Sequence, residues 1–167
     1  MKQVANSLLQ LATLRGYTPV KREINVQRLF DDIRQTMYGP LSEKRVILTT
    51  NASITSIWWQ EDLIKSLILN LCYNALKACP DVGGVIRLEA HENVLSVADN
   101  GCGIAPEDLP KLTEPFFRID KARSRGHGGV GLGLTLVKQI AQAHGADISI
   151  KSVVGAGTIV RVTFTSS

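Results

Sequence analysis

The stretch QEDLIKSLILNLCYNALKAC, residues 60–79, predicts a long helix with two chemically different faces. At about 100° per residue its polar side chains gather on one arc, and nearly all the others are apolar. Asn70 and Asn74 lie one helical turn apart on that arc, although asparagine is a poor helix former. Exposed helix faces favour Lys and Glu, so two neighbouring amides indicate a binding role. An ordinary solvated face is the alternative.

Around this helix the pattern predicts further helices and strands. Helices are expected at residues 1–14, 26–37, 106–112 and 131–144, and strands at 21–25, 45–49, 84–90, 94–98, 146–152 and 158–165. Tyr38-Gly39-Pro40 is expected to end the second helix, because proline interrupts helical hydrogen bonding. No domain boundary is indicated after about Pro19.

Composition narrows the class of protein. The chain has 167 residues, 44% hydrophobic and 20% charged, which suits one folded domain. Fourteen glycines beside 5% aromatics are typical of an α/β domain with glycine-rich loops. The net charge of +4 comes without a basic run interleaved with aromatics, so nucleic acid is not an expected partner. The sequence has no apolar run long enough to span a bilayer and no signal-peptide pattern. Its three cysteines fit a reducing compartment. Together these features predict a cytoplasmic domain without membrane contact.

A second informative segment is GHGGVGLGL, residues 126–134, which runs into a predicted helix. Glycines let backbone N–H groups approach an anion, and a helix N-terminus adds the positive end of its dipole, so phosphate binding is favoured. The segment is neither a Walker A loop, since no Gly-Lys-Ser/Thr ends it, nor a dinucleotide fingerprint, since no strand runs directly into it. A flexible loop is the alternative.

Asp99 ends an apolar strand and precedes two alternating glycines. A carboxylate there can accept a hydrogen bond from an exocyclic amine such as that of adenine, while the glycines leave room for a flat ring. A plain turn aspartate is the alternative. The amide oxygens of Asn70 and Asn74 are hard ligands suited to Mg²⁺ shared with phosphates, and Lys77 can add positive charge.

Five segments in a fixed order carry a family resemblance: LNLCYNALK at 69–77, DNGCGI at 99–104, EPFFR at 114–118, GVGLGL at 129–134 and GAGT at 155–158. They resemble the N box, first glycine box, F box and two later glycine boxes of the ATP-binding catalytic domain of sensor histidine kinases. That domain shares the Bergerat fold of the GHKL superfamily with type II topoisomerases, chaperone ATPases and mismatch-repair ATPases. The likeness covers about residues 21–164. It implies an α/β sandwich with a mixed, mainly antiparallel sheet and helices packed on one face.

The resemblance implies a role for each matching residue. Asn74 would coordinate Mg²⁺, with Asn70 beside it on the polyphosphate side. Arg118 would help to balance the γ-phosphate charge and, with Asn70, is the expected catalytic group. Asp99 would bind the adenine amine, and Thr158 would support the base through water. The other implied nucleotide contacts are Lys77, Gly101, Gly103, Ile104, Phe116, Gly129, Val130, Gly131, Leu132 and Gly133.

The same resemblance implies transfer of the ATP γ-phosphoryl group to a histidine on a separate dimerisation domain. No phosphoacceptor motif is present in this chain. Residues 1–19 are therefore expected to be the remnant of that helical domain with its linker, and residues 20–167 the catalytic domain. The implied partners are the phosphoacceptor domain of the same kinase and a downstream response regulator receiver domain. The parent is expected to be a homodimeric, membrane-anchored sensor.

Three other functions are alternatives to a histidine kinase domain. Conformational ATPases of the topoisomerase or chaperone type use a glutamate where this chain has Asn70, and an amide cannot act as a general base. A serine-kinase anti-sigma factor is disfavoured by the predicted helix at 1–14, and a degenerate nucleotide-binding module by the intact glycine segments. Val130 stands where the kinases usually have Thr. The histidines at 91, 127 and 144 are expected to be solvated rather than catalytic.

Overall fold

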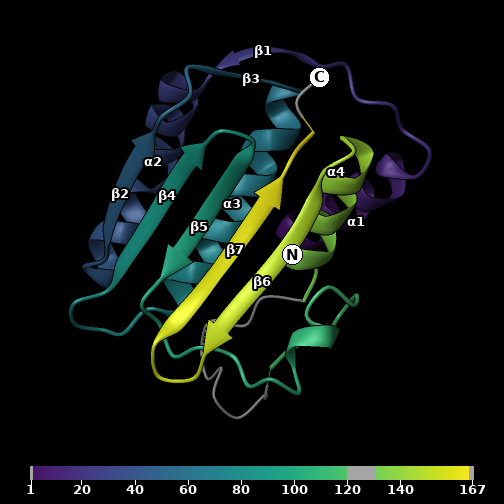
Figure 1. The fold of residues 1–167 in the computed structure, drawn as a ribbon. Coiled ribbons are helices and arrows are strands. Elements are labelled where there is room, and N and C mark those ends of the chain that lie inside the picture. Colours follow the sequence, from purple (N-terminus) through teal and green to yellow (C-terminus); the bar gives the residue numbers. More distant parts are fainter. Residues whose placement is uncertain (1, 120–130, 166–167) are drawn as a thin grey trace.

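The computed structural model describes residues 2–119 and 131–165, and at its centre is a five-stranded sheet (Figure 1). The strands are β2 (Ile47–Ala52), β4 (Val85–His91), β5 (Val94–Asp99), β6 (Asp147–Val153) and β7 (Gly157–Thr163). Their order across the sheet is β2-β4-β5-β7-β6. Only the β2–β4 pair is parallel, and the other three pairs are antiparallel. The predicted mixed, mainly antiparallel sheet is confirmed.

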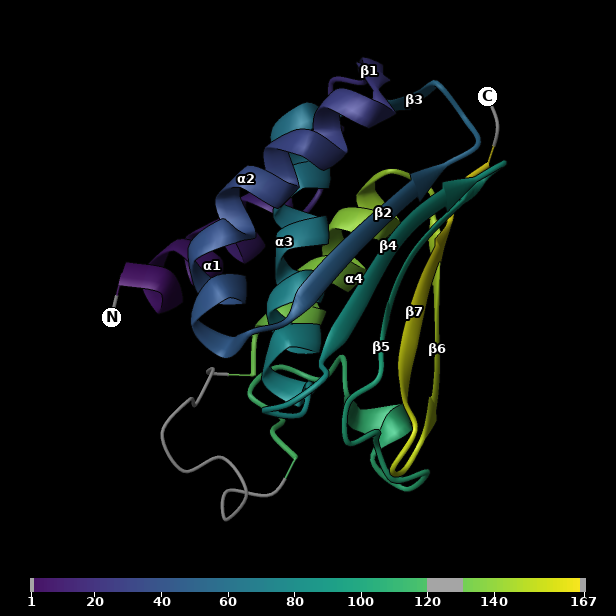
Figure 2. The same ribbon diagram turned by 90° about the vertical axis from the view of Figure 1, so that its left-hand side faces the viewer.

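The helices α2 (Val26–Lys44), α3 (Glu61–Ala78) and α4 (Gly133–Ala143) lie on one face of this sheet (Figure 2). The helix α1 (Lys2–Leu14) lies outside them and packs against α4. The strands β1 (Arg22–Asn25) and β3 (Ser56–Trp59) form a separate antiparallel pair. A short 3-10 helix, η1 (Leu109–Lys111), is all that forms of the helix predicted at 106–112. In the described part of the chain, no helix has both the length and the apolarity to cross a membrane.

The amphipathic pattern of α3 works as the sequence predicts. Its buried side chains are Leu63, Ile64, Leu67, Ile68, Leu71, Cys72, Ala75 and Leu76. Each large apolar side chain of this kind contributes about 1.5–3 kcal/mol when fully buried. Lys65, which interrupts the apolar face, is held by Asp32 of α2 at 3.0 Å and by Glu61 at 3.1 Å. Its charge therefore tethers α3 to α2 at the edge of the core.

The predicted end of α2 at Tyr38-Gly39-Pro40 is wrong, because the helix continues through Pro40 to Lys44. A proline inside a helix costs about 3 kcal/mol. Tertiary contacts outweigh that cost here: Leu41 is buried, and Lys44 Nζ reaches the Leu76 carbonyl of α3 at 2.6 Å. The helix ends instead at Arg45, whose backbone is left-handed (φ 58°).

The expectation that His144 is solvated is also wrong. Its ring is buried and stacks on Trp59 of β3, with ring centroids 4.0 Å apart. The Nδ1 atom lies 2.8 Å from the Ile140 carbonyl, and Nε2 lies 3.2 Å from the backbone nitrogen of Gln60. A carbonyl only accepts and a backbone N–H only donates, so the ring is neutral and carries its proton on Nδ1.

Candidate functional site

Asp99 ends β5 directly opposite Thr158 of β7. Its Oδ1 accepts a hydrogen bond from the Gly101 N–H at 2.8 Å. Burial raises the pKa of this carboxyl, while hydrogen bonds from the backbone of Gly101 and of Thr158 oppose the rise. The result is a half-buried carboxylate held at a fixed place and able to accept a further hydrogen bond.

The loop after Asp99 is wedged between two backbones. A Cβ atom at Gly101 would lie 2.4 Å from the Ala78 carbonyl oxygen at the end of α3. At Gly103 a Cβ would lie 2.2 Å from the Val153 carbonyl oxygen, and its φ of +74° already favours glycine. Both predicted glycines are therefore required by close approach. They fix the loop between α3 and the β6–β7 turn.

The amides of Asn70 and Asn74 converge on the first residue of α4. A Cβ at Gly133 would lie 3.2 Å from Asn70 Oδ1 and 3.7 Å from Asn74 Oδ1. Asn70 Nδ2 donates to the Ser66 carbonyl at 2.8 Å, which leaves Oδ1 turned toward Gly133. Asn74 Nδ2 lies 3.6 Å from the same point, so both side-chain amides approach one small space. Amide oxygens are ligands that Mg²⁺ accepts.

Positive charge gathers at the C-terminal end of α3. The pKa of Lys77 is lowered, first by burial and then by the positive charge of Arg118. Lys44 lies nearby and donates to the carbonyls of Leu76 and Lys77, at 2.6 Å and 3.2 Å. A bound anion near Lys77 and Arg118 would offset the repulsion that lowers the pKa of Lys77. Phosphate oxygens suit that requirement.

Residues 113–116 are hydrogen-bonded to the start of α4 and the residue pair before it. Phe116 donates its backbone N–H to the Gly131 carbonyl at 3.0 Å, and both residues have left-handed backbones. Thr135 Oγ1 donates to the Thr113 carbonyl at 3.0 Å. Phe116 itself is 59% exposed, so in this structure its side chain is not packed into the core.

The structure therefore brings together most of the predicted site. Asn70, Asn74 and Gly133 meet at one point, and Asp99 and Thr158 at another. Leu132 is buried at the start of α4, and the Ile104 N–H donates to Ser152 Oγ at 2.8 Å. Gly129 and Val130 lie outside the described residues. Sequence reasoning missed Ser152 and Lys44, because neither residue carries a local motif. Ile104, one partner of Ser152, and Leu76, a partner of Lys44, lie far from them in the chain.

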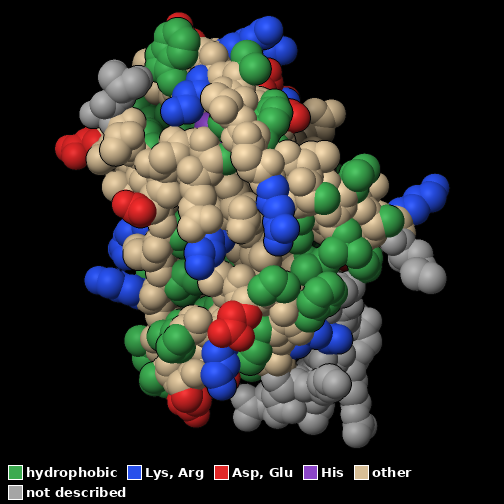
Figure 3. Space-filling model, turned by 90° about the vertical axis from the view of Figure 1, so that its right-hand side faces the viewer, with side chains coloured by type: hydrophobic (Ala, Val, Ile, Leu, Met, Phe, Trp, Pro, Cys, Tyr) green, Lys and Arg blue, Asp and Glu red, His purple; other side chains and the backbone are tan. Residues whose placement is uncertain are grey.

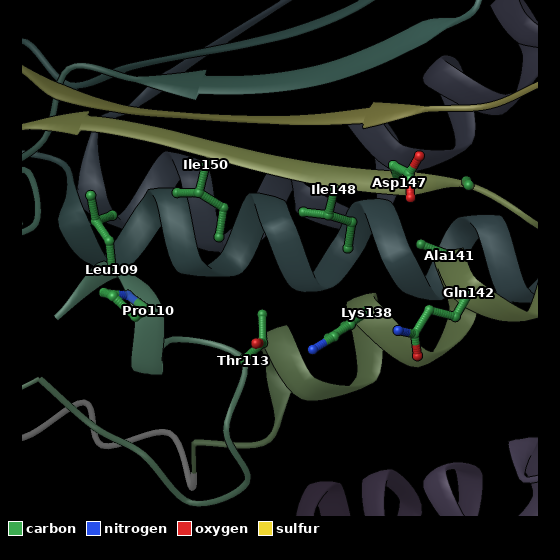
Figure 4. Close-up of a pocket in the computed structure, with 10 residues that line it drawn as sticks. Leu109, Pro110, Thr113, Lys138, Ala141, Gln142, Asp147, Ile148 and Ile150 are labelled. Atoms are coloured by element: carbon green, nitrogen blue, oxygen red, sulfur yellow. The ribbon is translucent and has the colours of Figure 1, made fainter.

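A cavity of about 460 Å³ lies beside this site, in the groove between α4, η1 and β6 (Figure 4). Ile148 and Ile150 project into it from β6, and Lys138 and Gln142 border it from α4. None of the predicted site residues lines it. Seen from a side at right angles to the view of Figure 1, the surface carries scattered charges of both signs between apolar patches (Figure 3).

The sequence of this chain is similar to that of known proteins. The family described as histidine kinase-, DNA gyrase B- and HSP90-like ATPase matches residues 59–167. Sensor histidine kinase YkoH of Bacillus subtilis is 36% identical over 98% of this chain and 36% of its own length. The phosphate regulon sensor protein PhoR of Pseudomonas aeruginosa is 36% identical over 95% of this chain and 37% of its own length.

Solved structures repeat the same architecture. A crystal structure of full-length ShkA in complex with AMPPNP superposes with a TM-score of 0.83 at 22% identity. The match covers 99% of this chain and 36% of that one. The Acinetobacter baumannii histidine kinase AdeS superposes with a TM-score of 0.79 at 18% identity, over 98% of this chain and 77% of that one. The chain spans little more than a third of the length of the two curated relatives above.

Proposed function

This chain belongs to the histidine kinase-, DNA gyrase B- and HSP90-like ATPase family and is the ATP-binding catalytic domain of a histidine kinase, and we propose how its residues hold Mg-ATP and which group receives the γ-phosphoryl group. Adenine binds against Asp99, whose carboxylate accepts from the exocyclic amine. The observation that carries the proposal is the half-buried Asp99 carboxylate, fixed by Gly101 and facing a loop that only glycines permit. Thr158, across the strand pair, supports the same edge of the base.

The polyphosphate runs from this corner toward the start of α4. Asn74, with Asn70 beside it, would hold Mg²⁺, because their amide oxygens converge next to Gly133. When bound there, Mg²⁺ would supply positive charge that offsets part of the negative charge of the phosphates. Lys77 binds a phosphate oxygen, and the backbone of Gly131, Leu132 and Gly133 lines the phosphate path; the contacts expected from Gly129 and Val130 fall outside the described residues.

Catalysis in this site is mostly positioning and charge stabilisation. Arg118 lies close enough to Lys77 for the two charges to interact, so a γ-phosphate bound there would be balanced by both. Asn70 cannot remove a proton from water, and its amide nitrogen already donates to the Ser66 carbonyl. The site therefore favours transfer to a strong nucleophile, such as a histidine presented by another domain, over hydrolysis of the conformational-ATPase kind.

The acceptor lies on a separate dimerisation domain of the same kinase, and a receiver domain then takes the phosphoryl group. We assign residues 1–19 to the end of that helical domain and the linker, and residues 20–167 to the catalytic domain. The helix α1 supports this division, since it packs on α4 from outside the sandwich. The parent is a homodimeric sensor anchored in the membrane, with this domain in the cytoplasm.

The assignment of Asp99 is tested by calorimetry of the Asp99→Asn variant with Mg-ATP. The substitution keeps the size but turns one acceptor oxygen into a donor, so affinity should fall by about 1.5–3 kcal/mol. Asp147→Asn at the start of exposed β6 is the matched control and should bind as the parent does. Because burial raises the pKa of Asp99, affinity should also begin to fall at a higher pH than a solvent-exposed aspartate would give. Equal affinity in Asp99→Asn and the parent would overturn the assignment.

Phosphoryl transfer is tested by mixing the chain with γ-labelled ATP, Mg²⁺ and a separate phosphoacceptor domain. Acid-labile, alkali-stable label should appear on the acceptor domain alone. The chain by itself should remain unlabelled and turn over ATP slowly, because a positioned base contributes about 10²–10⁴-fold and Asn70 cannot supply one. Several turnovers per second without the acceptor would favour the conformational ATPase.

A further inference from the structure

Ser152 of β6 connects three parts of the base corner through one hydroxyl group. Its Oγ lies 2.8 Å from the Ile104 nitrogen, 3.0 Å from the Gly157 carbonyl oxygen and 2.7 Å from Thr158 Oγ1. Ile104 lies in the loop after Asp99, and Gly157 and Thr158 are the first two residues of β7. The family roles outlined above assign nothing to this serine.

The donor and the acceptor of each hydrogen bond at Ser152 follow from the chemistry of its partners. The Ile104 N–H only donates and the Gly157 carbonyl only accepts. Ser152 has a single proton, so it donates to Gly157 and must accept from both Ile104 and Thr158. Every hydrogen-bonding position of the serine is then used, and the hydroxyl proton of Thr158 points at Ser152.

Thr158 is thereby left with lone pairs alone for any ligand. Its backbone N–H is occupied as well, since it donates to the Asp99 carboxylate. Asp99 itself, when ionised, can only accept. The two side chains that face each other at the ends of β5 and β7 therefore both present acceptors, directly or through a bridging water.

We propose that Ser152 is a positioning residue that makes this corner select a 6-amino purine over a 6-oxo purine. The inference rests on the proposed function, because it takes Asp99 and Thr158 as the groups facing the base. A 6-amino group donates to both acceptors. A 6-oxo group instead places a third acceptor next to the Asp99 and Thr158 oxygens and leaves buried polar atoms without hydrogen-bond partners. Such a mismatch discriminates strongly between two ligands. Without Ser152, the Thr158 hydroxyl can turn and donate to the 6-oxo group.

The test compares the affinities of ATP and inosine triphosphate, which differ in the 6-amino or 6-oxo group and in the proton on N1. Calorimetry with Mg²⁺ is carried out on the parent, Ser152→Ala and Ser152→Thr, which keeps the hydroxyl. The parent should prefer ATP. Ser152→Ala should reduce the ATP-to-inosine-triphosphate affinity ratio about tenfold, equivalent to one hydrogen bond. Ser152→Thr should restore it.

A double-mutant cycle separates hydroxyl orientation from general loosening of the loop. In the Thr158→Val background, which has no hydroxyl to release, Ser152→Ala should leave the ratio unchanged. Should Ser152→Ala fold poorly, Ser152→Cys offers the same space with a weak acceptor and should shift the ratio in the same direction. A parent that binds neither nucleotide overturns the proposed function itself. A parent that prefers ATP, with a ratio unmoved by Ser152→Ala, overturns only the role of Ser152.

Discussion

The two ends of α3 are built in opposite ways. At its start, Gln60 Oε1 accepts from the Tyr17 hydroxyl at 2.9 Å and from the Val20 N–H at 3.0 Å. The Gln60 N–H donates to the buried ring of His144. At its end, Lys77, Asn74 and the loop after Asp99 keep binding capacity that their own contacts do not use. One end is a closed junction, and the other is an open site.

At the closed end of α3, the N-cap position is occupied by a residue that makes tertiary hydrogen bonds instead of capping the helix. Gln60 occupies the N-cap position of α3, but its side chain makes no capping hydrogen bond. Ser, Thr, Asp or Asn at that position would stabilise the helix by about 1 kcal/mol. Gln60 instead holds the segment that joins α1 to the sandwich, which a shorter side chain would not reach. The junction therefore fixes the segment between α1 and the sandwich, at the end of α3 opposite the proposed nucleotide site.

The largest effect is expected from adding one methyl group at the open end. In Gly103→Ala, the new Cβ meets the Val153 carbonyl oxygen at 2.2 Å. Overpacking of this kind costs about 1–3 kcal/mol beyond the about 1–2 kcal/mol for a left-handed alanine. Gly155→Ala is the matched control, since its φ of +82° is similar but nothing lies within 4 Å of the new atom. Chemical denaturation should rank Gly103→Ala well below the control, with nucleotide binding lost only in the former.

The next effect concerns two lysines at different places on the same helix, α3. Lys77→Met should weaken ATP binding by about 1.5–3 kcal/mol, the value of a charge-assisted hydrogen bond, and leave adenosine binding unchanged. Lys65→Met removes a cation that pairs with Asp32 and Glu61 instead. Calorimetry should find the parent affinity in that control. If both variants lose the same affinity, general electrostatic attraction rather than a phosphate contact is responsible.

At the closed end, stability should depend on pH through His144. Burial lowers its pKa from 6.5, Lys21 lowers it further, and the Ile140 carbonyl and Asp62 oppose the shift. The unfolded chain therefore takes up this proton at a higher pH than the folded chain does. The free energy of unfolding keeps its full value above about pH 6.5 and falls as the pH drops through the range between the two pKa values.

Urea denaturation from about pH 8 to about pH 5 measures this dependence. His144→Phe can still stack on Trp59 but has no proton to gain, so its curve should be flatter over that range. His91→Phe, at the exposed end of β4, serves as the control and should keep the parent slope. An unchanged slope in His144→Phe would show that other groups cause it.

The smallest change is expected from Gln60→Asp. Aspartate can cap α3, which adds about 0.5–2 kcal/mol, but its shorter side chain releases Tyr17 and Val20. The two effects oppose each other, so global stability should move by less than about 1 kcal/mol. Limited trypsin digestion should nonetheless cut faster at Arg15 and Lys21. Tyr17→Phe removes one of the two hydrogen bonds and should be intermediate. Parent-like digestion in Gln60→Asp would mean that Gln60 does not anchor the linker.

The contrast between the ends of α3 also explains what the sequence could predict. The helix and its amide face follow from periodicity alone, because one turn of helix fixes which side chains are neighbours. The glycines after Asp99 follow from the need for close approach to a ring or a backbone. The role of Lys65 did not follow, since its main partner, Asp32, lies on another helix.

The errors arose where distant segments meet. His144 stands at the end of a predicted helix, which favours a solvated side chain, and no predicted strand carries its stacking partner Trp59. Pro40 was expected to end α2, although burial of Leu41 and the contacts of Lys44 carry the helix past it. Ser152 had no signal of its own: it lies opposite Thr158 in the pairing of β6 with β7, but the loop that carries Ile104 is distant in the chain and meets it only in the folded protein.

The central claim is that Mg-ATP binds at the open end of α3 and leaves the closed end undisturbed. Backbone amide NMR during titration with Mg-AMPPNP tests it directly. Chemical-shift changes should concentrate at Asn74, Lys77, Asp99–Ile104, Gly133 and Thr158. The amides of Val20, Gln60 and His144 should remain unchanged. Changes confined to the groove lined by Lys138, Ile148 and Ile150, or centred on Gln60, would contradict the account.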